Sequence, residues 1–222
     1  MYKQHSFVVE QEIAALERLG HPCVVTLFEA IETAKYVHLV LEFLEGGCLS
    51  ALVGDGKRLV ESESLRLLRQ MVSGLYHLHT VGVVHRDLKL ENLMLDAHRN
   101  ARIVDFGLAT IIDSPGQLLR EICGTAEYQA PELHKRLAHT GPPLDIWSLG
   151  VVFCAMLFGD LPFTGINKQH VAKRVLRGVY QLPTEASEKA LSLLQWMLSM
   201  EAQDRPGAEE LLKHPCLKIQ VH

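Results

Sequence analysis

Four polar side chains in the middle of the chain have the types and the spacing that phosphoryl transfer requires. Asp87, Lys89 and Asn92 lie in the run VVHRDLKLENLML, and Asp105 follows in the run RIVDFGLAT. Phosphoryl transfer asks little covalent chemistry of a protein. It needs a carboxylate near the nucleophilic hydroxyl, positive charge near the moving group, and oxygen ligands for a divalent cation. These four side chains supply that set, and we expect a loop and a strand end to present them.

The hydrophobic pattern predicts the elements that must position these side chains. In chain order we expect an opening helix that stops at Gly20, a hairpin-like pair of strands (24–28 and 37–43) that ends at Gly46–Gly47, a long helix capped by Ser62 and ended at Gly82, a central buried helix in DIWSLGVVFCAMLFG, and shorter helices at 167–177, 185–200 and 206–213. This order predicts a small strand-containing head followed by a mostly helical body.

Composition indicates an ordinary globular protein of 222 residues, with 48% hydrophobic and 22% charged residues. The net charge of −4 comes without a basic block, so we expect neither nucleic acid nor an anionic membrane as a partner. The most apolar stretch, residues 149–159, is too short to span a bilayer. No export signal follows Met1, so we expect a cytoplasmic protein, with the nucleus as the alternative.

Cysteines and histidines suggest neither disulfides nor a metal site. The five cysteines stand singly, without a CxxC pair, so we expect reduced thiols. His77, His79 and His85 cluster in the sequence, but no cysteine or carboxylate stands at a usual zinc spacing beside them. We therefore interpret them as structural side chains.

Five motifs in succession resemble those of eukaryotic protein kinases of the serine/threonine type. HRDLKLEN precedes DFG, and GTAEYQAPE, DIWSLG and an arginine before LLKHP follow in the family's order. The resemblance covers nearly the whole chain and is closest to the calcium/calmodulin-dependent and AMP-activated kinases. It implies an α+β, protein-kinase-like bilobal fold: a truncated small N-lobe at 1–44 and a complete, mainly helical C-lobe at 45–222.

The same resemblance assigns roles to individual residues in ATP-dependent phosphorylation of protein serine or threonine hydroxyls. Asp87 would orient the hydroxyl or accept its proton, and Lys89 would neutralise the transferring phosphate. Asn92 and Asp105 would hold Mg²⁺. The implied cofactor contacts are Glu42, Leu44 and Met94 together with Asn92 and Asp105. Structural or regulatory roles are implied for Glu12, Arg86, Glu121, Thr125, Glu132, Asp145 and Arg205.

The resemblance leads one to expect a lysine that pairs with Glu12, and the sequence before Glu12 does not show one. Glu12 stands where the family has a glutamate that pairs with a lysine of a preceding strand, but no glycine-rich loop or VAIK-like lysine precedes it. Lys3 lies only nine positions before Glu12, and we interpret it as a solvated terminal side chain. Two explanations stay open: an incomplete chain of a working kinase, or a pseudokinase or fragment that binds proteins without phosphotransfer. A regulatory partner at the exposed N-lobe fits either.

Regulation and substrate choice give further hypotheses. Glu121 stands four residues before Thr125, where related kinases carry a phosphorylated threonine, and its carboxylate would take part of the phosphate's role by pairing with Arg86. A solvated glutamate on a loop is the alternative. Glu91 and Glu127 match acidic positions that meet basic substrate residues in related kinases, with two surface glutamates as the alternative. We interpret Cys123 as a buried, inert thiol.

Overall fold

The computed structural model describes residues 3–33, 35–114, 116–180 and 186–218, with only the backbone described for residues 3–7. Lys3 therefore lies outside the described side chains. The α-helices are α1 (Lys3–Glu17), α2 (Glu61–Thr80), α3 (Pro131–His134), α4 (Pro142–Phe158), α5 (Lys168–Arg177), α6 (Glu188–Met197) and α7 (Ala208–Lys213). The strands are β1 (Leu27–Glu32), β2 (Val37–Leu41), β3 (Gly47–Cys48), β4 (Val83–Val84), β5 (Leu93–Leu95), β6 (Ala101–Ile103) and β7 (Thr110–Ile111). Short 3₁₀ helices are η1 (Leu49–Ala51), η2 (Leu90–Asn92), η3 (Ala126–Tyr128) and η4 (Ala202–Asp204).

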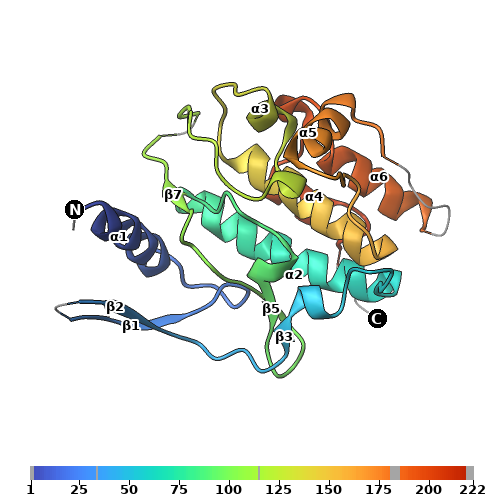
Figure 1. The fold of residues 1–222 in the computed structure, drawn as a ribbon. Coiled ribbons are helices and arrows are strands. Elements are labelled where there is room, and N and C mark those ends of the chain that lie inside the picture. Colours follow the sequence, from blue (N-terminus) through green and yellow to red (C-terminus); the bar gives the residue numbers. More distant parts are fainter. Residues whose placement is uncertain (1–2, 34, 115, 181–185, 219–222) are drawn as a thin grey trace.

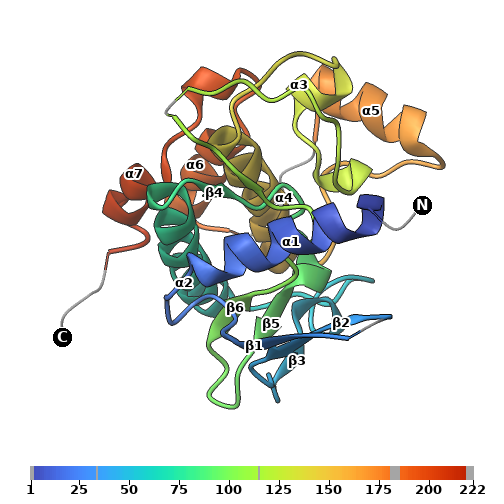
Figure 2. The same ribbon diagram turned by 90° about the vertical axis from the view of Figure 1, so that its left-hand side faces the viewer.

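The head consists of α1 and an antiparallel hairpin of β1 and β2 that extends away from the helical body (Figure 1). The turned view places α1 across the front of the body, above the small sheets (Figure 2). The first strand starts later than the predicted 24–28, because the preceding residues join another element. Val25 N donates to Ile103 O at 3.0 Å and Ile103 N to Cys23 O at 2.9 Å, so this segment binds the end of β6. The second strand ends at Leu41, two residues short of the prediction.

Helix α2 is the long helix that the leucine periodicity predicts, but its cap differs from the prediction. The N-cap is Val60, in an extended conformation and without a side-chain cap. Ser62 lies inside the first turn and is exposed, so the prediction that it caps the helix is wrong. Glu61 and Glu63 in that turn complement the partial positive charge of the helix N-terminus. The Glu61 carboxylate also accepts hydrogen bonds from Ser187 N and Oγ, at 2.8 and 2.6 Å.

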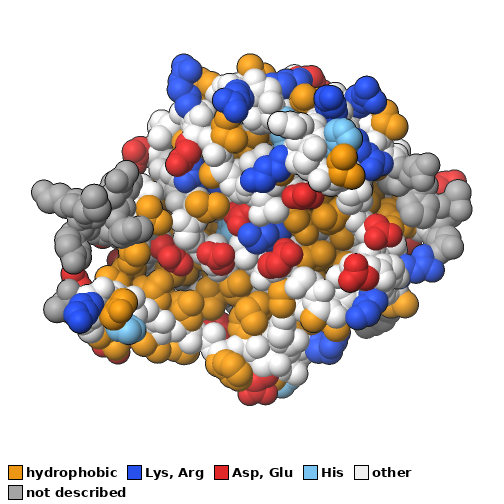
Figure 3. Space-filling view, in the orientation of Figure 1, with side chains coloured by type: hydrophobic (Ala, Val, Ile, Leu, Met, Phe, Trp, Pro, Cys, Tyr) orange, Lys and Arg blue, Asp and Glu red, His pale blue; other side chains and the backbone are white. Residues whose placement is uncertain are grey.

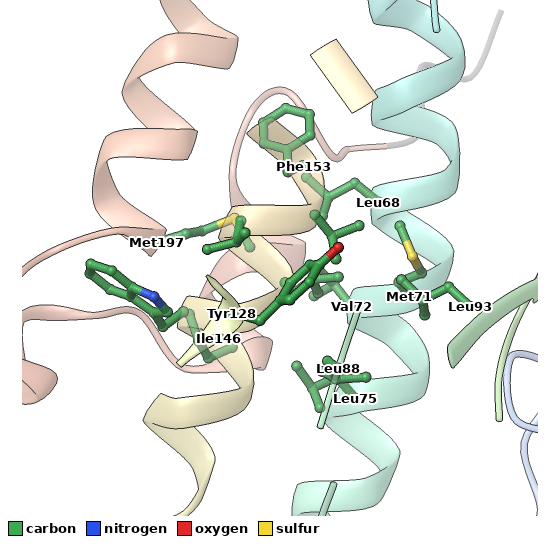
Figure 4. Packing of buried hydrophobic residues seen from close by; sticks show 14 of the residues in the cluster. Leu68, Met71, Val72, Leu75, Leu88, Leu93, Tyr128, Ile146, Phe153 and Met197 are labelled. Atoms are coloured by element: carbon green, nitrogen blue, oxygen red, sulfur yellow. The ribbon is translucent and has the colours of Figure 1, made fainter. Parts of the chain in front are cut away.

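The core of the body lies between α2, α4 and α6, as the close view shows (Figure 4). Helix α4 is buried on nearly all sides from Leu144 to Leu157, which its almost uniformly apolar sequence predicts. Phe153 of α4 and Leu68 and Val72 of α2 are fully buried in this cluster. In the part of the chain that the structure describes, no helix is both long and apolar enough to cross a membrane.

Two small sheets hold the segments that carry the predicted site. Strands β3, β5 and β6 form one antiparallel sheet, and β4 pairs with β7 in a second. The chain leaves β4 at Val84, passes through residues 85–92 and re-enters the first sheet at Leu93. It leaves β6 at Ile103 and reaches Asp105 two residues later. Both predicted polar runs therefore lie next to strand ends, as the sequence suggested.

Candidate active site

A buried aspartate of α4 anchors the loop that follows β4. Asp145, in the first turn of α4, accepts hydrogen bonds from His85 N at 3.0 Å and Arg86 N at 2.9 Å. His79 Nε2 lies 3.0 Å from the same carboxylate. Arg86 has a φ of 66°, a left-handed conformation that is costly for a residue with a side chain. Charge-assisted hydrogen bonds from the adjacent amides offset that cost and fix the loop to the centre of the body.

The Asp87 carboxylate is buried and has donors on both oxygens. Oδ1 accepts from Thr125 N at 2.9 Å and Thr125 Oγ1 at 3.0 Å. Oδ2 accepts from Lys89 Nζ at 2.6 Å and from Asn92 Nδ2 at 3.3 Å. A carboxylate has about four acceptor positions, so this one is saturated. The structure thus brings together Asp87, Lys89, Asn92 and Thr125, residues that span 39 positions of sequence (125 − 87 + 1).

The charge of Asp87 also acts on the neighbouring ammonium group. Partial burial alone would lower the pKa of Lys89, but the hydrogen bond and the negative charge of Asp87 outweigh it. Glu91 and Asp105 add to the same effect, so the pKa of Lys89 is raised above its ordinary value. Lys89 Nζ also lies 3.3 Å from Thr125 Oγ1. The site therefore holds a firmly protonated cation beside a desolvated carboxylate.

Asn92 and Asp105 provide oxygen ligands suited to Mg²⁺. Asn92 is buried and its Nδ2 donates to Asp87 O at 3.0 Å, while its backbone O accepts from Val104 N at 3.0 Å. That second bond fixes the segment of Asp105 next to Asn92. Asp105 has a φ of 63° and an exposed carboxylate that accepts from Gly107 N at 3.3 Å. One amide oxygen and one carboxylate are hard ligands, so the residues fit a magnesium ion shared with phosphate oxygens.

The Phe106 ring packs against His85 of the catalytic loop. It is fully buried and its centroid lies 5.0 Å from that of His85, whose Nε2 lies 3.0 Å from Val104 O. The three clustered histidines thus have three different partners, since His77 Nε2 accepts from Gly20 N at 3.2 Å and His79 contacts Asp145. Their interpretation as structural side chains agrees with these contacts.

Glu12 of α1 points toward Asp105 rather than toward a cation. A Cβ atom built on Gly107 would lie 3.3 Å from Asp105 Oδ1 and 3.8 Å from Glu12 Oε2, so the two carboxylates share one neighbourhood. Burial raises the pKa of Glu12, and the charge of Asp105 raises it further. Among the described side chains, none forms an ion pair with Glu12. The structure therefore places Glu12 at the site without the basic partner that the family resemblance leads one to expect.

The predicted adenine contacts lie directly after β2 and on β5. Glu42 N donates to Thr26 O at 2.9 Å, and the Glu42 carboxylate accepts from Thr26 N and from Arg102 Nε, each at 3.2 Å. Leu44 is buried, and Met94 of β5 lies opposite Cys48 of β3. The side chain of Glu42 is thus committed to the strand-end contacts of the head. The roles of Glu42, Leu44 and Met94 toward a nucleotide stay predictions.

The predicted regulatory pair is in contact. Arg86 Nη1 donates to Glu121 Oε2 at 2.7 Å, and Arg86 Nε donates to Leu108 O at 2.7 Å. The Arg86 side chain is buried, whereas 68% of the Glu121 side chain is exposed. Nearby, burial raises the pKa of the half-buried Cys123 thiol, as Glu121 does, while Arg86 opposes the shift. A thiol in this setting is mainly protonated and weakly nucleophilic.

Unlike the pair of Arg86 and Glu121, the ion pair between Arg205 and Glu132 is buried. Arg205 donates from Nη1 and Nη2 to the two oxygens of Glu132, at 2.7 and 2.8 Å. The guanidinium also donates to carbonyl oxygens of Ser199, Met200 and Pro143, and lies 5.0 Å from the Trp147 ring centroid. Every donor of this arginine therefore has an acceptor, as a buried charge requires.

Comparison with known proteins decides the family. Residues 2–217 match the family model described as protein kinase domain. The chain belongs to this family. The mouse (Mus musculus) protein sperm motility kinase Z is 38% identical over 207 residues, which are 93% of this chain and 41% of that protein. Probable serine/threonine-protein kinase MARK-A of Dictyostelium discoideum is 36% identical over 211 residues, 95% of this chain and 20% of that protein.

The family assignment confirms two predictions from the sequence. The chain is a eukaryotic protein kinase domain of the serine/threonine type, and its α+β architecture, with a small strand-containing head and a helical body, is kinase-like. The chain spans less than half the length of the two relatives. Sequence reasoning missed His79 as a partner of Asp145, and Thr125 as a direct donor to Asp87. Each contact joins residues that are far apart in the sequence, so no local pattern around His79 or Thr125 could have predicted it.

Proposed function

We propose that this kinase domain transfers the γ-phosphate of ATP to serine or threonine hydroxyls of proteins, with Mg²⁺ as the cofactor. The observation that carries the proposal is the saturated Asp87 carboxylate, held by Lys89, Asn92 and Thr125. A side chain buried with a full set of donors is fixed in orientation, as a group that must meet a substrate hydroxyl has to be.

The geometry suggests how these residues divide the work. Asp87 accepts a hydrogen bond from the incoming hydroxyl, so one of its present donors must leave. Lys89 is the donor that fits, because its side chain is partly exposed and its positive charge is needed at the transferring phosphate as negative charge shifts there. Thr125 keeps its backbone N–H on Asp87 and maintains the carboxylate orientation. The hydroxyl proton passes to Asp87 as the oxygen–phosphorus bond forms and the bond to ADP breaks.

Asn92 and Asp105 would hold Mg²⁺, which would supply positive charge against the phosphates. Asn92 has its amide nitrogen on Asp87 O, so its amide oxygen is oriented away from that bond and is available as a ligand. Asp105 is kept open to solvent by the left-handed turn at its own position. Single cysteines without disulfide partners favour the cytoplasm as the site of action, with the nucleus as the alternative.

Replacing Asp87 tests the proposal. Asp87→Asn keeps the size and most contacts of the side chain but removes the proton acceptor, so phosphate transfer to a mixed protein substrate should fall about 10²–10⁴-fold. The melting temperature in the presence of Mg·ATP, compared with its absence, should still rise in the variant. Equal transfer rates for the variant and the parent would overturn the proposed role of Asp87.

A binding module without phosphotransfer is the second candidate, and the position of Glu12 favours it. The carboxylates of Glu12 and Asp105 lie in one neighbourhood without a described cation between them, which opposes the binding of further negative charge. Absence of both Mg·ATP stabilisation and transfer would support this candidate over the first.

We also propose that Glu121 keeps the activation segment attached to the catalytic loop through Arg86. The 2.7 Å contact supports this role, and the high exposure of Glu121 limits its strength. Glu121→Gln should lower the transfer rate by up to about fivefold, the equivalent of one exposed ion pair. The matched change Asp113→Asn, at an exposed position of the same segment without an ion pair among the described residues, should leave it within about twofold.

A further inference from the structure

Helix α5 and its flanks carry positive charge only. Residues 161–180 contain Lys168, Lys173, Arg174 and Arg177 but no aspartate or glutamate, in a chain whose net charge is −4. Helices on a protein surface commonly interleave both signs at a spacing of three or four residues, because such pairs stabilise the helix. Here that internal compensation is missing, so the stretch is an isolated cationic surface on an acidic protein.

Among the described residues, these cations make few contacts that stabilise the fold. Within the described residues, none of the four forms an ion pair with a carboxylate, and Arg174 donates only to Thr164 O and Oγ1, at 3.1 and 3.4 Å. Val171 and Val175 are the buried residues of the helix, and Asn167 caps its N-terminus through His170 N. Packing and capping therefore explain the presence of the helix, but they leave the charges on its outer face without a structural role.

Apolar side chains accompany the charges. Ile166 before the helix is 85% exposed, and Val179 after it is 68% exposed. Leu176 on the helix is also exposed. In the space-filling view, Lys and Arg side chains gather with hydrophobic ones along the upper edge, over α3 and α5, whereas Asp and Glu side chains occupy the middle (Figure 3). Such a mixture of cations and apolar groups is complementary to an acidic segment that also carries apolar residues.

The position of α5 connects this surface to the catalytic loop. Helix α5 packs against both η3 and α3. The 3₁₀ helix η3 starts directly after Thr125, whose amide and hydroxyl bind the Asp87 carboxylate. Only one short element therefore separates the cationic surface from the residue that would meet the phosphoacceptor. A protein with its hydroxyl at Asp87 can reach α5 with another part of its chain.

We propose that the outer face of α5 docks an acidic, apolar-containing segment of the protein substrate. The proposal rests on the proposed function and extends it to the class of substrate: proteins that carry such a segment apart from the phosphoacceptor. Long-range attraction would raise the rate of encounter, and the exposed Ile166, Leu176 and Val179 would hold the segment once bound. An anionic membrane is the alternative occupant of a cationic surface, and the vesicle measurement below distinguishes it from a protein segment.

A binding measurement without nucleotide tests the docking surface directly. The probe is a fluorescein-labelled peptide built from glutamate, aspartate and leucine, and the control is the same peptide with glutamine and asparagine in place of the acids. Fluorescence anisotropy with the 222-residue protein should show binding of the acidic peptide only, weakening as salt rises. The double variant Lys173→Glu, Arg177→Glu reverses two charges at i and i+4, and should weaken binding about tenfold or more.

A matched variant separates local from overall charge. Arg18→Glu with Lys218→Glu changes the net charge by the same amount at exposed positions outside α5, and should leave peptide affinity within about twofold. Circular dichroism and melting temperature must show that both double variants are folded. Equal weakening by the two double variants, or no binding of the acidic peptide to the parent, would overturn the proposal.

Two further measurements test whether the surface of α5 binds a protein segment or a membrane. Vesicles of phosphatidylserine and phosphatidylcholine should not retain the protein in sedimentation, and retention that depends on Lys173 and Arg177 would overturn the protein-segment proposal in favour of a membrane. With a substrate protein that carries an acidic segment, the α5 variant should raise KM and leave kcat unchanged. Because the anisotropy arm contains no nucleotide, a failure of phosphotransfer leaves its result intact, and the two proposals fail separately.

Discussion

The catalytic-loop region and the N-terminal head differ in how their carboxylates are paired and in how well their apolar side chains are buried. Around the loop, the buried carboxylates of Asp87, Glu132 and Asp145 each accept two or more hydrogen bonds. In the head, Glu12 is half-buried beside another carboxylate, and Phe43 is 84% exposed. Apolar residues of the hairpin between them are also exposed, from 37% for Leu41 to 67% for Phe28, and include Ile31, Val37 and Val40.

The difference shows that contacts within the helical body determine the geometry of the catalytic loop. The loop holds its orientation through contacts within residues 79–205, all of which the structure describes except residues 115 and 181–185. In the head, apolar side chains of β1 and β2 are exposed, and Glu12 has no basic partner among the described residues. Stability and the catalytic geometry should therefore depend on the body and on the buried side of α1, which includes Ala15 and Leu16, whereas the β1–β2 hairpin should contribute little to either.

Breaking the buried pair of the body should have the largest effect on stability. Arg205→Ala leaves Glu132 as a buried carboxylate without its cation, and should reduce the free energy of unfolding by about 3–5 kcal/mol. Urea denaturation followed by circular dichroism measures the loss. The exposed pair of Lys213 and Glu209 on α7 is the control, and Lys213→Ala should leave the free energy of unfolding unchanged within the error of the measurement. Similar losses for both variants would contradict the contrast between buried and exposed pairs.

Truncating one apolar side chain in each region should sharpen the comparison. Leu75 of α2 is fully buried, so Leu75→Ala should cost about 2–5 kcal/mol through lost burial and a residual cavity. Phe43→Ala removes a larger side chain from the head, yet it should change stability by less than about 0.5 kcal/mol, because that ring is already in water. Thermal and urea unfolding measure both. A larger cost for Phe43→Ala would show that the head is covered in solution, for example by self-association.

The smallest effect, and the only stabilising one, should come from Glu12. Its pKa is raised in the folded protein, so the folded state binds this proton more tightly than the unfolded state does. The contribution of Glu12 to stability is thus fully present below its unfolded pKa and is lost as pH rises through the folded value. At pH 7, Glu12→Gln should raise the melting temperature by about 1–2 °C.

The pH profile is the check on that assignment. The advantage of Glu12→Gln should disappear near pH 4, where the carboxyl of the parent is protonated in both states. Glu29→Gln, at an exposed position of β1, should leave the melting temperature unchanged across the same range. A gain that persists at pH 4 would assign the effect to packing rather than to charge.

Local patterns in the sequence predicted most of the fold, and the errors come from long-range competition. The period of the leucines in α2 and the uniformly apolar run of α4 indicated both helices, because each pattern is complete within its own segment. The first strand was placed too early because Val24 and Val25 have strand-like side chains. They bind Ile103 instead, and nothing within the local segment identifies that partner.

The site shows the same limit. Asp87, Lys89, Asn92 and Asp105 could be named because their spacing matches a chemistry and a family. The contacts that orient them could not, because Thr125 and Asp145 approach from elements far along the chain. The stacked rings of His21 and His77, with centroids 5.4 Å apart, were missed for the same reason. Burial also lowers the pKa of His21, and a sequence carries no information on burial at a loop position.

The bonds from Asp145 to the amides of His85 and Arg86 also determine the timescale on which the site can open. Amide hydrogens exchange with solvent only when their hydrogen bonds break, and these two end on a helix at the centre of the body. Because the Asp145 side chain is itself buried, we expect these two amides to exchange slowly. Amides of the β1–β2 hairpin need only a local opening. We therefore expect the catalytic loop to open more rarely than the hairpin, so that the two regions of one small protein should differ in their exchange rates.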